Sequence, residues 1–185
     1  MDNLILVTGG ARSGKSSFGE ELVKKFGSNV LYIATSIPFD EEMKLRVKKH
    51  RERRPSCWET VEAYKDFDLK LDGKLVGKSA VMLDCITVMI SNIMFEKQVD
   101  WDNLRSDDND GLEEYVRCEV DKLLRIIEEA GLHFIVVTNE TGMGIVPENA
   151  LARVFRDIAG RMNQNLAKAA GEVYLCVSGI PVKIK

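Results

Sequence analysis

The amino-acid sequence predicts an α/β domain in which a mainly parallel β-sheet is flanked by helices. Short apolar runs alternate with longer stretches of helical periodicity, and a glycine-rich turn joins the first run directly to the first helix. Parallel strands need crossover connections, and the alternating helices supply them. The 185 residues are 45% hydrophobic, which suffices for one substantial core. We therefore predict a single domain over residues 1–185.

Five short apolar runs have the composition of strands that are buried on both faces. They are Leu4–Thr8, Val30–Ala34, Ala80–Asp84, Phe134–Thr138 and Val173–Val177. Five longer stretches have helical spacing: Lys15–Phe26, Asp40–Arg54, Ile86–Phe95, Leu112–Ala130 and Glu148–Ala170. Pro55 ends the second helix, because proline disfavours a helical conformation in the residue before it. We interpret the aspartate-rich stretch 100–111 as a solvated loop or insertion, since it lacks the ligand spacing of a metal-binding loop.

Charge and composition argue against several classes of protein. The net charge is -3, so no overall basic surface attracts nucleic acid or anionic lipid. No apolar stretch approaches the ~20 residues of a membrane span, and the start of the chain lacks the pattern of an export signal. We therefore expect a cytoplasmic protein with no nucleic-acid partner and no membrane insertion. Cys57, Cys85, Cys118 and Cys176 form no metal-ligand pattern, and the runs around Cys85 and Cys176 predict buried thiols.

A phosphate-binding motif follows the first predicted strand. Its eight residues fill every fixed position of G-x-x-x-x-G-K-[ST]: Gly9, Gly10, Ala11, Arg12, Ser13, Gly14, Lys15 and Ser16. Glycines let backbone N–H groups face phosphate oxygens, and the following helix adds its positive N-terminal end. We expect Lys15 to reach the β- and γ-phosphates and the Ser16 hydroxyl to bind Mg²⁺. Strand, loop and helix together predict a P-loop NTPase of RecA-like architecture.

A second candidate for Mg²⁺ lies at the end of the strand Ala80–Asp84. Asp84 closes an apolar run, the position from which a carboxylate can hold the water shell of an ion bound at Ser16. Alternatively, Asp84 only caps the helix that follows. If it serves the metal, Mg²⁺ enters together with GTP or ATP as substrate, and we predict no permanently bound cofactor.

One of the two histidines lies in the second predicted helix. Arg46, His50 and Arg54 are spaced four apart and share a helix face. Nearby positive charge keeps the His50 imidazole neutral and nucleophilic, and arginines bind phosphate oxygens in pairs of hydrogen bonds. His50 is therefore either a nucleophile for a phosphorus centre or an incidental residue of a solvated basic helix. We interpret His133, at a strand entrance, as structural.

With these residues identified, the sequence resembles the bifunctional adenosylcobinamide kinase / adenosylcobinamide-phosphate guanylyltransferase family of cobalamin biosynthesis. The resemblance covers nearly the whole chain. Its segments are LVTGGARSGKS at 6–16, LYIATS at 31–36, VTNETGMGIVPEN at 137–149, FRDIAGR at 155–161 and VSGIPVKIK at 177–185. Many NTPases share the loop, but the joint set of segments is specific.

The resemblance implies two reactions. ATP or GTP phosphorylates the aminopropanol hydroxyl of adenosylcobinamide, and GMP then passes from GTP to that phosphate through a guanylylated histidine, giving adenosylcobinamide-GDP. His50 matches this histidine, so the implied catalytic residues are His50 and Lys15. The implied nucleotide contacts beyond the loop are Ala34, Thr35, Ser36, Arg51, Glu52, Arg53, Arg54, Glu62 and Asp84. The resemblance also implies a homo-oligomer, specifically a trimer.

The segment 139–144 follows the carboxyl end of a strand, where open α/β sheets bind ligands. It either shapes the corrinoid or nucleotide site or is a plain glycine-rich connection. Three other functions share the loop: a P-loop kinase of another metabolite, a GTP-controlled switch and a nucleic-acid motor. The N-K-x-D sequence that reads guanine in such switches is absent, and the net charge disfavours a motor. Guanylylation of His50 would discriminate against another kinase.

Overall fold

A computed structural model describes residues 1–37, 54–97, 99, 101 and 106–185. The predicted helix Asp40–Arg54 therefore lies outside the described residues, apart from Arg54. Within the described residues, no helix is long and apolar enough to cross a membrane.

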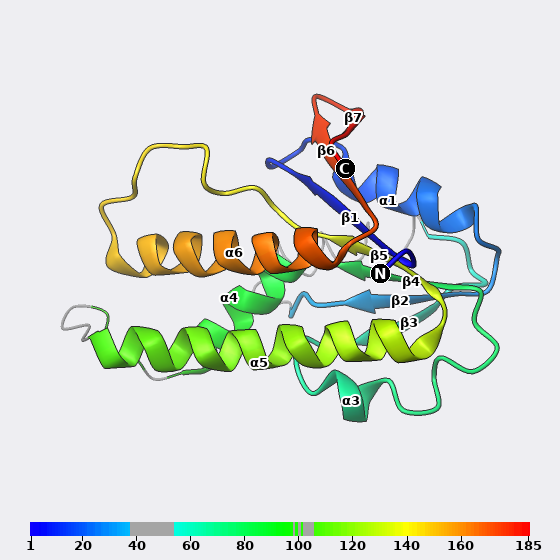
Figure 1. Cartoon of the computed structure of the whole chain (residues 1–185), viewed down its shortest axis with the longest axis horizontal. Helices are drawn as coiled ribbons and strands as arrows, with labels where there is room; N and C mark the ends of the chain where they lie inside the picture. The colour runs from blue at the N-terminus through cyan, green and yellow to red at the C-terminus, as the bar shows by residue number, and fades with distance from the viewer. Residues whose placement is uncertain (38–53, 98, 100, 102–105) are drawn as a thin grey trace.

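The described residues form a seven-stranded sheet with the strand order β3-β2-β4-β5-β1-β6-β7 (Figure 1). Its strands are β1 (Leu4–Gly9), β2 (Val30–Ala34), β3 (Glu59–Glu62), β4 (Ala80–Asp84), β5 (His133–Val137), β6 (Glu172–Val177) and β7 (Ile180–Lys183). Neighbouring strands from β3 to β6 pair in parallel, and β7 alone pairs antiparallel, with β6. The prediction of a mainly parallel sheet is confirmed, and each of the five predicted strands is present. All the parallel strands end at the same edge.

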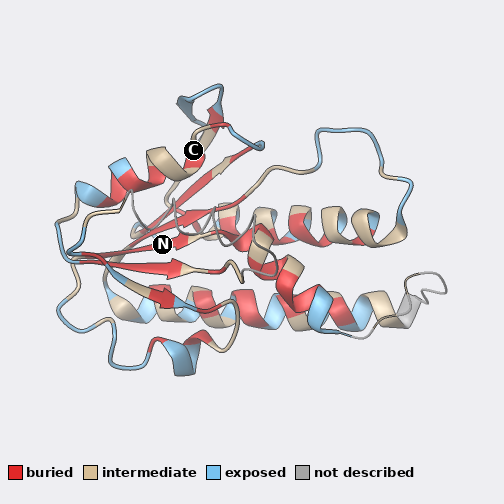
Figure 2. Ribbon diagram, turned by 180° about the vertical axis from the view of Figure 1, so that it is seen from behind, coloured by how far each residue is buried: buried red, intermediate tan, exposed pale blue. Residues whose placement is uncertain are grey.

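Helices cover both faces of the sheet. They are α1 (Lys15–Lys24), α3 (Phe67–Lys70), α4 (Ile86–Glu96), α5 (Ser106–Ala130) and α6 (Ala150–Ala169). Alternate residues of the strands point to opposite faces, so Leu4 and Leu6 join the core under α4, α5 and α6, whereas Ile5 and Val7 join the core under α1. Figure 2 shows the buried strands between these helix layers.

Two of the described helices begin at residues other than those predicted. The structure starts α5 at Ser106 instead of Leu112, so part of the stretch interpreted as a loop is helical. Apolar periodicity begins only at Leu112, the first buried apolar residue of α5, and it could not reveal the polar turns before it. The helix α6 starts at Ala150 instead of Glu148, because the Asn149 side chain accepts a hydrogen bond from the Ala152 amide and caps the helix.

Other packing predictions are confirmed. His133 begins β5 and stacks on Phe26 with 3.9 Å between ring centroids, which is a structural role. Cys85 and Cys176 are buried free thiols. The helix α1 lies so close to the sheet that a Cβ on Gly19 would be 2.9 Å from the Met82 Cε atom. This close approach fixes the helix whose first turn carries the phosphate-binding motif.

Candidate active site at the carboxyl edge of the sheet

The glycine-rich loop emerges from β1 and enters α1 as the motif requires. A Cβ on Gly9 would be 2.6 Å from the Cys176 carbonyl oxygen, so only glycine fits there. Gly14 precedes the helix with φ of 88°, a left-handed conformation that glycine adopts without strain. Lys15 is nearly buried, and its Nζ donates to the Gly10 carbonyl oxygen at 3.0 Å, so the side chain folds back over the loop. This geometry fits a phosphate cradle.

The turn between β6 and β7 supports the cradle from the side. Ser178 and Gly179 both have positive φ, 51° and 85°, as in a two-residue hairpin turn. The Gly179 amide donates to the Ser13 carbonyl oxygen at 2.9 Å. A Cβ on Gly14 would lie 3.0 Å from the Gly179 Cα. Sequence reasoning missed this contact, although a Ser-Gly pair between apolar runs is a hairpin signal.

Asp84 ends β4 and accepts a hydrogen bond from a tyrosine of the neighbouring strand. The Tyr32 hydroxyl donates to Asp84 Oδ2 at 3.0 Å. Burial and the Asp84 charge raise the pKa of Tyr32 well above its ordinary value, so the hydroxyl keeps its proton and donates. The alternative role of Asp84 as a helix cap is wrong, because the N-cap residue of α4 is Cys85.

The groups at this edge fit Mg²⁺. Proteins bind this ion through oxygen atoms, usually one or two carboxylates together with phosphates and water. The half-buried Asp84 carboxylate, held by Tyr32, and the Ser16 hydroxyl at the start of α1 supply such oxygens. No cluster of three or more His, Cys, Asp or Glu suited to a metal occurs among the described residues. The chemistry of the available groups thus suits an ion completed by nucleotide phosphates.

A separate pocket of about 360 Å³ lies at the carboxyl ends of β2 and β3. Its lining residues are Ala34, Thr35, Ser36, Ile37, Glu62, Ala63, Tyr64, Lys65, Asp66 and Lys70. The structure therefore brings together four predicted nucleotide contacts, Ala34 to Ser36 and Glu62, from two strands. The strand order places β4 next to this pocket. The glycine-rich loop follows β1, which lies two strands beyond β4, about 10 Å from it at the usual strand spacing of about 4.8 Å. Asp84 therefore stands between the pocket and the loop.

Thr35, which lines the pocket, forms hydrogen bonds with the residues at the end of β4. Its hydroxyl donates to the Cys85 carbonyl oxygen and accepts from the Cys85 amide, both at 2.8 Å. Its own amide donates to the Asp84 carbonyl oxygen, and its carbonyl oxygen accepts from Asn92. Each polar group of Thr35 thus bonds within the protein. A contact between Thr35 and nucleotide stays a prediction.

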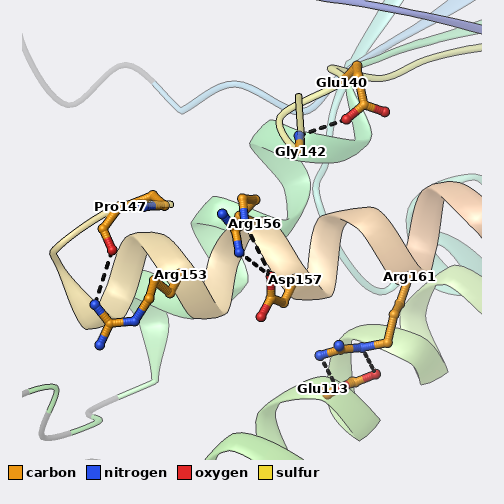
Figure 3. Close-up of polar contacts among 8 residues, drawn as sticks. All are labelled: Glu113, Glu140, Gly142, Pro147, Arg153, Arg156, Asp157 and Arg161. Carbon is orange, nitrogen blue, oxygen red and sulfur yellow. Dashed lines mark hydrogen bonds and ion pairs between the residues drawn. The ribbon is translucent and has the colours of Figure 1, made fainter. Parts of the chain in front are cut away.

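The segment 139–144 packs beside the glycine-rich loop. The Glu140 amide donates to the Gly9 carbonyl oxygen at 3.1 Å, and the Glu140 carboxylate accepts from the Gly142 amide at 2.7 Å (Figure 3). The Asn139 side-chain amide donates to the Thr87 hydroxyl on α4, and the Asn139 backbone carbonyl oxygen accepts from the Asn163 side chain on α6. The position agrees with a role in shaping the site, but ligand contact by this segment stays a prediction.

Four predicted site residues, His50, Arg51, Glu52 and Arg53, lie outside the described residues. Arg54 is described, and its guanidinium carbon lies 3.4 Å from the centroid of the Tyr32 ring. Its Nε and Nη1 atoms are buried and have no hydrogen-bond partner in the described part of the chain. Sequence reasoning missed Tyr32, although a tyrosine within a fully buried strand needs a partner for its hydroxyl.

Comparisons with known proteins agree on one family. The model of the family described as cobinamide kinase / cobinamide phosphate guanyltransferase matches residues 5–184. A curated relative from Escherichia coli K12, bifunctional adenosylcobalamin biosynthesis protein CobU, is 47% identical over 182 residues, covering 98% of this chain and 99% of the relative. The protein of the same name from Salmonella typhimurium is 47% identical over 187 residues, with the same coverage. Bifunctional adenosylcobalamin biosynthesis protein CobP from Pseudomonas aeruginosa is 34% identical over 180 residues, covering 97% of this chain and 96% of the relative.

Proposed function

Since this chain belongs to the cobinamide kinase / cobinamide phosphate guanyltransferase family, we propose that it carries out both reactions at the carboxyl edge of its sheet. It phosphorylates adenosylcobinamide and then transfers GMP from GTP to the resulting phosphate, giving adenosylcobinamide-GDP. The observation that carries this proposal is the arrangement of the glycine-rich loop, Asp84 and the pocket at β2 and β3 along one edge.

In the kinase step the protein positions the nucleotide phosphates and provides positive charge beside them. The loop amides and Lys15 hold the phosphates of ATP or GTP, while the substrate hydroxyl attacks the γ-phosphorus in line. The hydroxyl oxygen forms the new P–O bond, the bond to the β-phosphate oxygen breaks, and the hydroxyl proton leaves to solvent. Ser16 and Asp84 would hold Mg²⁺, which when bound offsets charge on the β- and γ-phosphates.

In the transferase step we assign the nucleophile to His50. Its ring nitrogen attacks the α-phosphorus of GTP, an N–P bond forms, and pyrophosphate leaves. An oxygen of the corrinoid phosphate then attacks the same phosphorus and releases the histidine. Support comes from Arg54, which follows His50 closely in the sequence and stands beside the Asp84–Tyr32 pair. We place the guanosine of GTP in the pocket, where the Glu62 carboxylate can accept hydrogen bonds from the guanine N–H groups.

The test uses GTP labelled at the α-phosphorus, with wild type, His50→Asn and His133→Asn. We expect acid-labile, alkali-stable label on wild type and on His133→Asn but not on His50→Asn, because a phosphoramidate forms only on the nucleophile. His133 is a suitable control because it lies at the opposite, amino end of β5. Label on His50→Asn would overturn the assignment, and absence of label from wild type that binds GTP would overturn the transferase proposal.

We further propose that the protein acts as a homotrimer in the cytoplasm, where its nucleotide substrates are found. Exposed apolar side chains on the segment after β5 and on β7 support an oligomer: Met143, Ile145, Val146, Ile180 and Val182. Sedimentation equilibrium should give three times the chain mass of 20.8 kDa.

A further inference from the structure

We propose that Tyr32 is a positioning residue that couples Asp84 to Arg54, orienting the carboxylate toward Mg²⁺ with its hydroxyl and holding the guanidinium for a phosphate group with its ring. This inference rests on the proposed function and deepens it. Sequence reasoning assigned Tyr32 no role.

The first half of the coupling is a hydrogen bond between neighbouring strands. Tyr32 lies on β2 opposite Met82 on β4, and Ala34 lies opposite Asp84. Tyr32 and Met82 belong to the core under α1, so strand alternation directs Asp84 to the same face. The Tyr32 hydroxyl reaches along this face to Asp84 Oδ2 at 3.0 Å. A bond from one fixed donor limits rotation of the carboxylate on the face where α1 begins with Lys15 and Ser16.

The second half is the stack of Arg54 on the ring. The guanidinium carbon is 3.4 Å from the ring centroid, a distance at which the negative face of the ring attracts the cation. Two of the donors of Arg54, Nε and Nη1, are buried without a partner in the described part of the chain. A buried guanidinium with unpaired donors is costly. A phosphate oxygen would pair these donors, since the arginine fork matches phosphate geometry.

Tyr32 is held firmly enough to act in this way. It is 1% exposed, and its ring stacks with Trp58 at 6.3 Å between centroids. Trp58 in turn is covered by Lys24 of α1. The ring therefore gives Asp84 and Arg54 a common, rigid support. Loss of the whole Tyr32 ring should therefore weaken the binding of both Mg²⁺ and phosphate. Loss of the hydroxyl alone should weaken only the binding of Mg²⁺.

The experiment measures GTP binding, not turnover, as a function of Mg²⁺ concentration in wild type, Tyr32→Phe, Tyr32→Leu and Tyr174→Phe. In Tyr32→Phe we expect half-maximal GTP binding to need about 10-fold more Mg²⁺, with wild-type affinity at saturating Mg²⁺, because a hydrogen bond to a charged group is lost and the ring remains. In Tyr32→Leu we expect weaker GTP binding at every Mg²⁺ concentration, since Arg54 loses its support as well.

Tyr174→Phe is the matched control, because its hydroxyl also donates to a carboxylate, Glu172, at 2.6 Å but away from the site. We expect it to bind GTP with the wild-type Mg²⁺ dependence. A wild-type response in Tyr32→Phe, or equal loss in Tyr174→Phe, would overturn the coupling and leave the proposed function standing. Absence of Mg²⁺-dependent GTP binding by wild type would overturn both.

Discussion

Among single residues, the cysteines show how strongly position decides chemistry. Cys57 and Cys118 are exposed, whereas Cys85 and Cys176 are buried beside the candidate site. Burial, followed by the charge of the adjacent Asp84, raises the pKa of the Cys85 thiol to about 11. The thiol next to the candidate metal carboxylate is therefore inert at neutral pH and adds no negative charge there.

The Cys85 thiol should make the fold less stable at alkaline pH. An unfolded thiol titrates near 9.0 and the folded one near 11, so the folded state holds the proton more tightly between these values. Its contribution to stability is complete below about pH 9 and decreases as pH rises toward 11. Between pH 8 and pH 10 we expect wild type to lose about 1 kcal/mol more unfolding free energy than Cys85→Ala.

Urea unfolding at the two pH values measures this difference. Cys118→Ala is the control, because that thiol is exposed and should leave the alkaline loss as large as in wild type. An equal alkaline loss in wild type and Cys85→Ala would contradict the assignment to Cys85.

Among the elements, α1 is the one whose placement matters most for the cradle. It packs on β4 and β5 through a glycine, and a Cβ on Gly19 would lie 2.9 Å from Met82 Cε and 3.2 Å from Val137 Cγ2. Contact with β4 and β5 thus fixes the position of α1 against the sheet. Any outward shift of this helix would carry Lys15 and Ser16 with it.

Gly19→Ala and Gly160→Ala should have opposite effects on stability. We expect Gly19→Ala to lower the unfolding free energy by about 1–3 kcal/mol, because overpacking forces the helix from the sheet. Gly160 is on α6 with no atom within 4 Å of an added Cβ, so Gly160→Ala should raise it by up to about 1 kcal/mol through helix propensity. Chemical denaturation measures both, and a stabilised Gly19→Ala would contradict the close packing.

The elements that could be predicted from the sequence are those with strong local patterns. β1, β2, β4, β5 and β6 are apolar runs. In β3, by contrast, only Val61 is buried, and every residue of β7 is exposed. Edge strands therefore lack the signal that the prediction relies on. The same limit applies to the site. The loop Gly9–Ser16 is contiguous, but the contact between Tyr32 and Asp84 joins separate strands and needed the strand order.

In the whole molecule, the strand order brings distant parts of the chain to one edge. The strand β1 lies between β5 and β6, and the turn between β6 and β7 donates a hydrogen bond to Ser13. The glycine-rich loop is therefore complete only when the sheet is complete. We therefore expect nucleotide binding by the loop to depend on assembly of the whole sheet, not on the motif alone.

Gly179→Ala tests this dependence, with Gly77→Ala as control. Both glycines have positive φ, 85° and 72°, and no atom lies within 4 Å of an added Cβ on either. Each substitution should cost about 1–2 kcal/mol of unfolding free energy through backbone strain. Only Gly179→Ala should also weaken GTP binding, because its turn supports Ser13. Isothermal titration calorimetry measures the GTP affinity of both variants. Equal affinities would show that the turn between β6 and β7 does not shape the loop.

The position of β1 also has a consequence during translation. The ribosome makes β1 and its loop early, but the partners of β1, residues 133–137 and 172–177, are made much later. At roughly 5–20 residues per second, the wait is on the order of 10–30 s. Throughout that time the nascent chain carries an apolar strand without its neighbours, a segment that chaperones would recognise. A polypeptide released before β6 would contain the whole nucleotide-binding motif and still be unable to form the cradle.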